Sequence, residues 1–167
     1  MDASAKAIMG TAICIVIAVS FIVLSGPNLI FPSSTEVPFE EIGWSWLSGY
    51  ESRNNLTIRD NETWETVWTE MESIQSHPAD LPEVNFTREM IIAVFQGERG
   101  SSGYWTNITR IIMTNTHYVV YIDEIHPGEN CVLLAVMTYP YHIVKISDVP
   151  LNLPVQFVYN IIIHDCE

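Results

Sequence analysis

The chain has 167 residues, which is enough for one compact domain of ordinary size. It carries 7 Lys and Arg residues against 20 Asp and Glu, so its formal net charge is −13. Such a surface repels phosphate backbones and has too few cations for a basic patch, so no binding to nucleic acid is expected. Hydrophobic residues make up 48% of the chain, which is enough for a buried core and argues against a disordered protein.

The first long segment, Ala7 to Leu24, is apolar and contains no charged residue. A helix of that length spans roughly 27 Å, close to the hydrocarbon thickness of a bilayer. Lys6 precedes it and acidic residues follow, so the positive-inside rule places the N-terminus in the cytoplasm and the rest of the chain outside. We expect residues 1–24 to be the transmembrane anchor of a single-pass cell-membrane protein. A cleaved secretory signal is the alternative.

The residues after this segment support an exterior location. Residues 25–38 contain three prolines and several Ser and Thr residues, which is typical of a linker. The remaining residues, 39–167, contain four Asn-x-Thr sequons, more than the roughly 1.5 sequons that chance placement gives. The predicted glycosylation sites are Asn55, Asn61, Asn85 and Asn107. Thr-rich strands can also generate such sequons without glycosylation.

The exterior part is predicted to be an α+β domain of mainly antiparallel sheet, with one main helix packed on the sheet. The helix is expected from about Glu62 to Ser73, because Trp64, Val67, Trp68 and Met71 share one face and would pack on the sheet. A first strand is expected near Trp44 and Trp46. The other predicted strands are Met90 to Gln96, buried on both faces, Tyr104 to Met113, Tyr118 to Ile125, Cys131 to Met137, His142 to Ile146 and Gln156 to His164.

Two of the three cysteines lie outside the apolar segment. Cys131 and Cys166 are predicted to form a disulfide, because an exterior compartment is oxidising. The bridge would hold the C-terminal strand. Two unpaired thiols are the alternative, and Cys14 is interpreted as a small apolar residue in the membrane segment.

No set of residues in the sequence predicts a catalytic site, a cofactor or a metal site. The Gly-rich segment 97–103 (GERGSSG) lacks the Lys and the following helix of a phosphate-binding loop, and is interpreted as a flexible hairpin connection that could dock a partner. The histidines lack the H-x-H or H-x-x-x-H spacing of zinc ligands. A calcium site built from scattered carboxylates is an alternative that the sequence leaves open.

Several short motifs in order resemble the PrcB C-terminal domain family over roughly residues 39–147. They include Ser48-Gly49-Tyr50, the buried run Met90 to Gly97, Ser102-Gly103-Tyr104 and the segment Tyr139 to Ile146. Members of this family are small secreted or lipid-anchored domains, and the namesake is a subunit that stabilises a cell-surface protease complex. The resemblance therefore implies an accessory role and supplies no catalytic residue.

From these observations we expect a membrane-anchored extracytoplasmic domain that is not an enzyme. It would bind an unidentified cell-envelope protein as an accessory or stabilising subunit. The expected contacts are exposed strand edges, the 97–103 loop and the Tyr-Pro-Tyr corner, and the residues assigned to partner binding are Arg99, Ser101, Ser102, Tyr104, Tyr139 and Tyr141. The alternatives are a structural subunit of a homo-oligomeric surface assembly and an envelope hydrolase.

Overall fold

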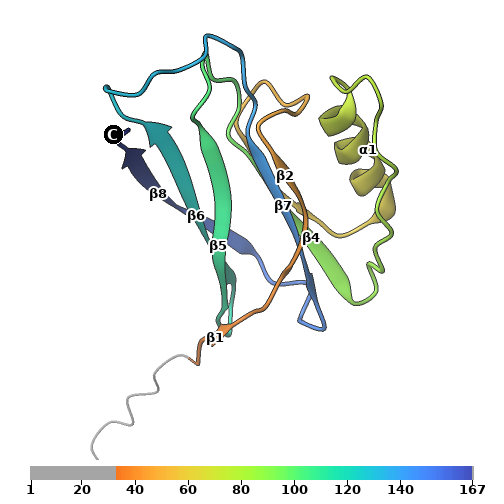
Figure 1. Ribbon diagram of the computed structural model, residues 1–167. Coiled ribbons are helices and arrows are strands. Elements are labelled where there is room, and N and C mark those ends of the chain that lie inside the picture. The colour runs from red at the N-terminus through yellow and green to blue at the C-terminus, as the bar shows by residue number, and fades with distance from the viewer. Residues whose placement is uncertain (1–32, 167) are drawn as a thin grey trace, which may run out of the picture. The chain divides into compact units, whose positions relative to one another are not determined.

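The computed structural model describes residues 33–166, which form two β-sheets and one helix (Figure 1). These residues belong to the second of the two compact units of the chain, Pro32–Glu167. None of the helices in residues 33–166 has the length and apolar character needed to cross a bilayer. The anchor predicted at residues 1–24 lies outside the described residues.

The elements are β1 (Thr35–Glu36), β2 (Glu40–Ser45), β3 (Asn54–Ile58), α1 (Asn61–Glu72), β4 (Glu89–Phe95), β5 (Trp105–Met113), β6 (Tyr118–Pro127), β7 (Tyr141–Ser147) and β8 (Val155–His164).

Each of the two sheets has four strands. Sheet A has the order β1-β5-β6-β8, and sheet B has the order β2-β7-β4-β3. All pairs are antiparallel except β6 with β8, which run parallel. The chain leaves β6, passes through β7 in the other sheet and returns to β8, so it re-enters sheet A in the direction of β6.

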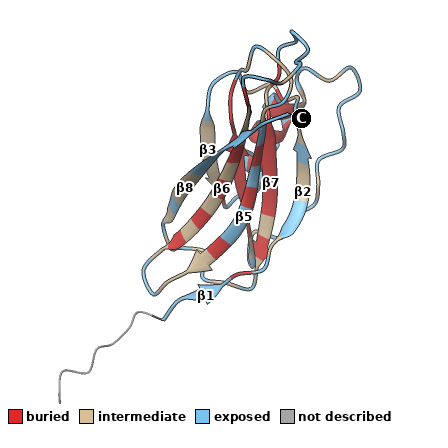
Figure 2. Ribbon diagram, turned by 60° about the vertical axis from the view of Figure 1, so that its left-hand side comes forward, coloured by how far each residue is buried: buried red, intermediate tan, exposed pale blue. Residues whose placement is uncertain are grey.

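The main core lies between the two sheets. Alternate residues of β4 (Met90, Ile92 and Val94) point toward sheet A, where they pack with inward residues of β5 and β6 such as Ile108 and Ile122. Figure 2 shows this buried interior as red bands along β5, β6 and β7. The two sheets are therefore held together by aliphatic side chains from both inner faces.

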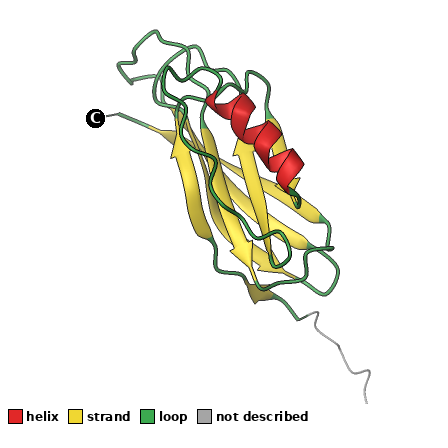
Figure 3. Ribbon diagram, turned by 90° about the vertical axis from the view of Figure 1, so that its right-hand side faces the viewer, coloured by secondary structure: helices red, strands yellow, loops and turns green. Residues whose placement is uncertain are grey.

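The helix covers the other face of sheet B, so the domain has three layers (Figure 3). It begins after Asp60, whose carboxylate accepts a hydrogen bond from the Thr63 N–H at 2.8 Å. Its buried residues are Trp64, Val67, Trp68 and Met71, as its apolar periodicity predicts. They pack on Ile91, Ala93 and Phe95, which point to the other face of β4. This confirms the prediction that the strand is buried on both faces.

Four local features differ from the sequence prediction. Cys131–Met137 forms no strand, because the segment spans from sheet A to sheet B and has no neighbouring strand to pair with. The 97–103 loop also joins the two sheets, so it is not a hairpin connection. A strand that was not predicted, β3, pairs with β4. In the segment expected to be a linker, Thr35–Glu36 pairs with β5, and the Val37 side chain is buried.

Candidate functional site

Two strand edges lie next to each other on one side of the domain. β2 is an edge strand of sheet B, and β5 is covered by β1 only at Ile112 and Met113. The Val37 N–H also donates to the Ile111 carbonyl at 2.9 Å. Among the described residues, the part of β5 before Ile111 has β6 on one side and no paired strand on the other. Unpaired strand edges are common sites for the addition of a further strand.

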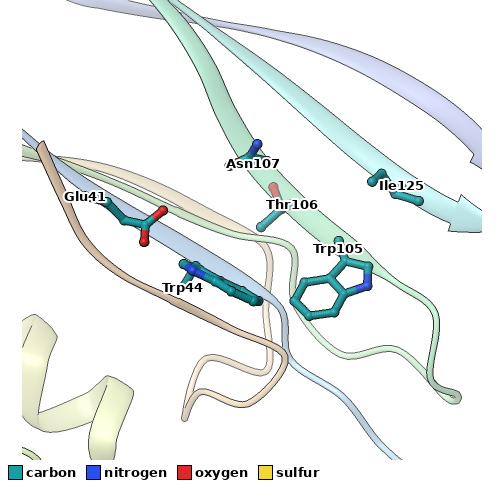
Figure 4. Close-up of a pocket in the computed structure, with 6 residues that line it drawn as sticks. All are labelled: Glu41, Trp44, Trp105, Thr106, Asn107 and Ile125. Atoms are coloured by element: carbon teal, nitrogen blue, oxygen red, sulfur yellow. The ribbon is translucent and has the colours of Figure 1, made fainter. Parts of the chain in front are cut away.

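Trp44 of β2 and Trp105 of β5 face each other across these edges (Figure 4). Their ring centroids are 5.1 Å apart with an interplanar angle of 54°. Trp44 is 53% exposed and Trp105 is 36% exposed, whereas tryptophans are highly buried on average. We call the space around them the Trp cleft. It is a pocket of about 310 Å³ lined by Glu41, Trp44, Trp105, Thr106, Asn107 and Ile125.

Polar groups that lack a hydrogen-bond partner lie at or near the floor of the Trp cleft. The Thr106 hydroxyl is buried and has no partner among the described residues. His142 is also buried, and its Nδ1 accepts a hydrogen bond from the Ile108 N–H at 2.7 Å. In the neutral ring the proton therefore lies on Nε2, which is 3.3 Å from the Glu41 carboxylate but makes no well-directed hydrogen bond. Burial lowers the pKa of His142, and the Glu41 carboxylate opposes this shift only in part, so the neutral ring is favoured.

Further buried polar side chains lie inside the same end of the domain as the Trp cleft. Glu124 of β6 is buried and accepts two hydrogen bonds from the Arg53 guanidinium, one of them at 2.8 Å. Both polar side-chain atoms of Gln96, the Nε of Arg99 and the Nε2 of His126 are buried and have no hydrogen-bond partner in the described part of the chain. Buried polar groups are normally satisfied, so this concentration marks the end that holds the Trp cleft as different from the apolar remainder of the core.

Five of the six residues predicted to bind a partner lie at this end of the domain. The Arg99 guanidinium lies 5.5 Å from the centroid of the Tyr104 ring. The main chains of Arg99 and Thr138 form two hydrogen bonds in an antiparallel bridge. This bridge holds the 97–103 loop against the segment that precedes β7. Ser101 and Ser102 add hydrogen bonds to the 131–138 segment, and the Tyr139 hydroxyl donates to Glu98 at 3.3 Å.

Tyr141 has a different environment. Its ring is buried in the core between α1 and sheet B, and its centroid lies 6.1 Å from that of Phe95. Burial, followed by the nearby Glu72 carboxylate, raises the pKa of its hydroxyl. Tyr141 therefore packs the helix layer and does not reach the surface expected for it.

The four sequons differ in exposure. Asn61, Asn85 and Asn107 are exposed, and Asn107 lines the Trp cleft. Asn55 is half-buried on β3, and its side-chain oxygen accepts a hydrogen bond from the Tyr159 hydroxyl at 2.6 Å. Glycosylation of Asn55 would disturb this contact, and a glycan on Asn107 would occupy the mouth of the cleft.

The predicted disulfide joins Cys131 to Cys166, with the two Cα atoms 4.9 Å apart. It ties the loop after β6 to the residues that follow β8. No group of three or more His, Cys, Asp or Glu residues within 33–166 could hold a metal ion.

The sequence pattern at the Trp cleft was only partly informative. The sequence predicts a strand at Trp44 but carries no signal that connects this residue with Trp105, Glu41 or His142. The one available signal was the pair of tryptophans in segments predicted to be strands. Their proximity depends on which strands form the edges of the two sheets.

The fold defines a small two-sheet β domain with a single helix on one face and an open cleft between strand edges. Residues 90–147, from β4 through β7, match the family model described as PrcB C-terminal. The resemblance predicted from the sequence is thereby confirmed over these residues, which include Trp105, Thr106 and His142. Searches of curated proteins and of solved structures gave no match.

Proposed function

We propose that this protein is a membrane-anchored, extracytoplasmic binding domain without catalytic activity, which acts as an accessory subunit of a cell-surface protein complex. The match to the PrcB C-terminal family model over residues 90–147 supports the accessory role that the sequence resemblance to this family implies. The apolar segment of residues 7–24 supports the anchored location.

The observation that carries the proposal is the Trp cleft between two unpaired strand edges. An extended segment of the partner can lie along β5, because no described strand pairs with this edge from Trp105 to Ile108. The Ile108 N–H is already used there, since it donates a hydrogen bond to His142 Nδ1. An apolar side chain of that segment would enter between the two indoles. Tryptophans that become buried in a complex often contribute much of the binding free energy. Tryptophans that stay exposed at the rim of an interface contribute little, so truncating them costs little affinity.

The test is recovery of partners with the tagged full-length chain from native membranes in a mild detergent. Trp44→Ala and Trp105→Ala should each reduce the recovered partner by roughly tenfold or more, as expected for an interface hot spot. Trp46→Ala is the matched control, since Trp46 is similarly exposed on the same chain segment but does not line the cleft. It should leave recovery unchanged.

The outcomes separate the two parts of the proposal. If Trp46→Ala reduces recovery and the cleft variants do not, the partner binds elsewhere on the domain. If the wild-type chain recovers no partner from its native membrane, the accessory role is wrong. Circular dichroism of each variant shows whether the fold is intact.

A further inference from the structure

β8 is a ten-residue edge strand, and no strand within residues 33–166 pairs with its outer side (Figures 1 and 2). Natural proteins usually protect such edges with Lys, Pro, bulges or a covering segment. Between Val155 and Ile163, β8 contains no charged residue and no proline, and its pairing with β6 has no register shift. The edge is therefore open to a further strand.

The end of β8 also carries exposed aliphatic side chains. Ile161 and Ile163 are each 59% exposed, although they lie on the same face as Phe157 and Tyr159, which pack against the main core. Ile162 is partly exposed on the opposite face. Three consecutive exposed isoleucines on an edge strand are characteristic of an interaction surface.

The charge of the chain favours a second copy as the occupant of this edge. With a net charge of −13, two copies repel each other wherever their acidic faces meet. β8 is uncharged along almost its whole length, so pairing there avoids this repulsion. Two copies can therefore associate through β8 without bringing like charges close together.

We propose that two copies of the chain pair antiparallel through β8, about a two-fold axis at Asn160. This arrangement joins the two copies of sheet A into one continuous sheet, and it is self-complementary, as a two-fold interface requires. The inference does not rest on the proposed binding of a partner at the Trp cleft.

The register follows from the side chains. In an antiparallel pair, directly opposite residues share a face, so a two-fold axis passes through a residue and its own copy. With the axis at Asn160, apolar residues oppose apolar residues, in the pairs Tyr159 with Ile161, Val158 with Ile162, and Phe157 with Ile163. An axis at Tyr159 would instead oppose Val158 with Asn160 and Gln156 with Ile162.

The ends of the strand are also complementary. Asp165 follows β8, whereas Arg59 lies beside the start of β8 and donates hydrogen bonds to the carbonyls of Leu151 and Leu153. Antiparallel pairing brings the acidic end of one copy toward the basic end of the other. Opposite charges at the rim favour this orientation over a parallel one.

Cross-linking tests both the pairing and its register. The full-length chain is used in its membrane, with Cys14→Ala so that the introduced cysteine is the free thiol. At the axis, opposite Cβ atoms lie about 5 Å apart, so Asn160→Cys should form a covalent dimer under mild oxidation. Gln156→Cys is the matched control, because in this register its two copies are about 27 Å apart. Asn160→Cys should give roughly tenfold more dimer than the control.

A second pair of variants tests the apolar contacts. Ile161→Lys, added to the Asn160→Cys chain, should abolish the covalent dimer because it places a charge opposite Tyr159 of the other copy. Ile74→Lys changes a similarly exposed isoleucine beyond the end of α1 and should leave the dimer unchanged. Equal cross-linking by Asn160→Cys and Gln156→Cys, a monomer in the membrane, or cross-linking of Asn160→Cys to a different protein would each overturn the proposal.

Discussion

The ion pair between Arg53 and Glu124 is the strongest test of how this domain tolerates a buried charge. The Glu124 side chain is 2% exposed and that of Arg53 is 43% exposed, so the carboxylate depends on the guanidinium for compensation. The Arg53 guanidinium also lies 5.0 Å from the Tyr159 ring centroid. The hydrogen bond with Glu124 is the main cause that raises the pKa of Arg53.

Arg53→Met removes the guanidinium and leaves the buried Glu124 carboxylate with only the His126 ring beside it, at 3.6 Å from Nε2. Breaking a buried ion pair typically costs 3–5 kcal/mol of the free energy of unfolding, and the partial exposure of Arg53 places this case near 3 kcal/mol. For a domain of this size that corresponds to a decrease in Tm of roughly 10 °C. The double variant Arg53→Met with Glu124→Met should recover most of the loss, because no unpaired charge remains.

Thermal unfolding by circular dichroism at pH 7.5, on the full chain in mild detergent, measures the loss in the single variant and its recovery in the double variant.

Arg88→Met is the matched control for this experiment. Arg88 pairs with Asp148, but both side chains are more than half exposed, so its loss should not change Tm measurably. If Arg53→Met melts within about 2 °C of the wild type at pH 7.5, the reasoning about the buried carboxylate is refuted.

Three further outcomes are expected. Replacing both Cys131 and Cys166 by Ser should lower the free energy of unfolding by about 3–4 kcal/mol in urea titrations, because the bridge closes a separation of 35 residues; an unchanged midpoint would contradict this. The lowered pKa of His142 means that the unfolded state binds more protons than the folded state, so the free energy of unfolding should fall as the pH drops below about 6.5. His142→Gln should weaken this pH dependence. In a host that glycosylates the chain, Asn61→Gln should remove one glycan on a gel and Asn55→Gln should remove none, because Asn61 is exposed and Asn55 is half-buried. A shift with Asn55→Gln would show that modification precedes the contact with Tyr159.

The sequence by itself determined the features that depend on local periodicity. The face formed by Trp64, Val67, Trp68 and Met71 predicted the helix and its buried side, because a spacing of 3.6 residues places them together whatever the rest of the fold is. The continuous apolar run of β4 predicted a strand buried on both faces. The family resemblance over residues 90–147 likewise needed only the order of short motifs.

Only the tertiary structure decided which strands are neighbours. The apolar run at Cys131–Met137 has the composition of a strand, but the chain crosses between sheets there and no pairing partner is available. The contact of Trp44 with Trp105 and the open edge of β8 also follow from strand order. Hydrogen bonds between strands join residues far apart in the sequence, so strand order is set by packing of the whole domain, which no local pattern encodes.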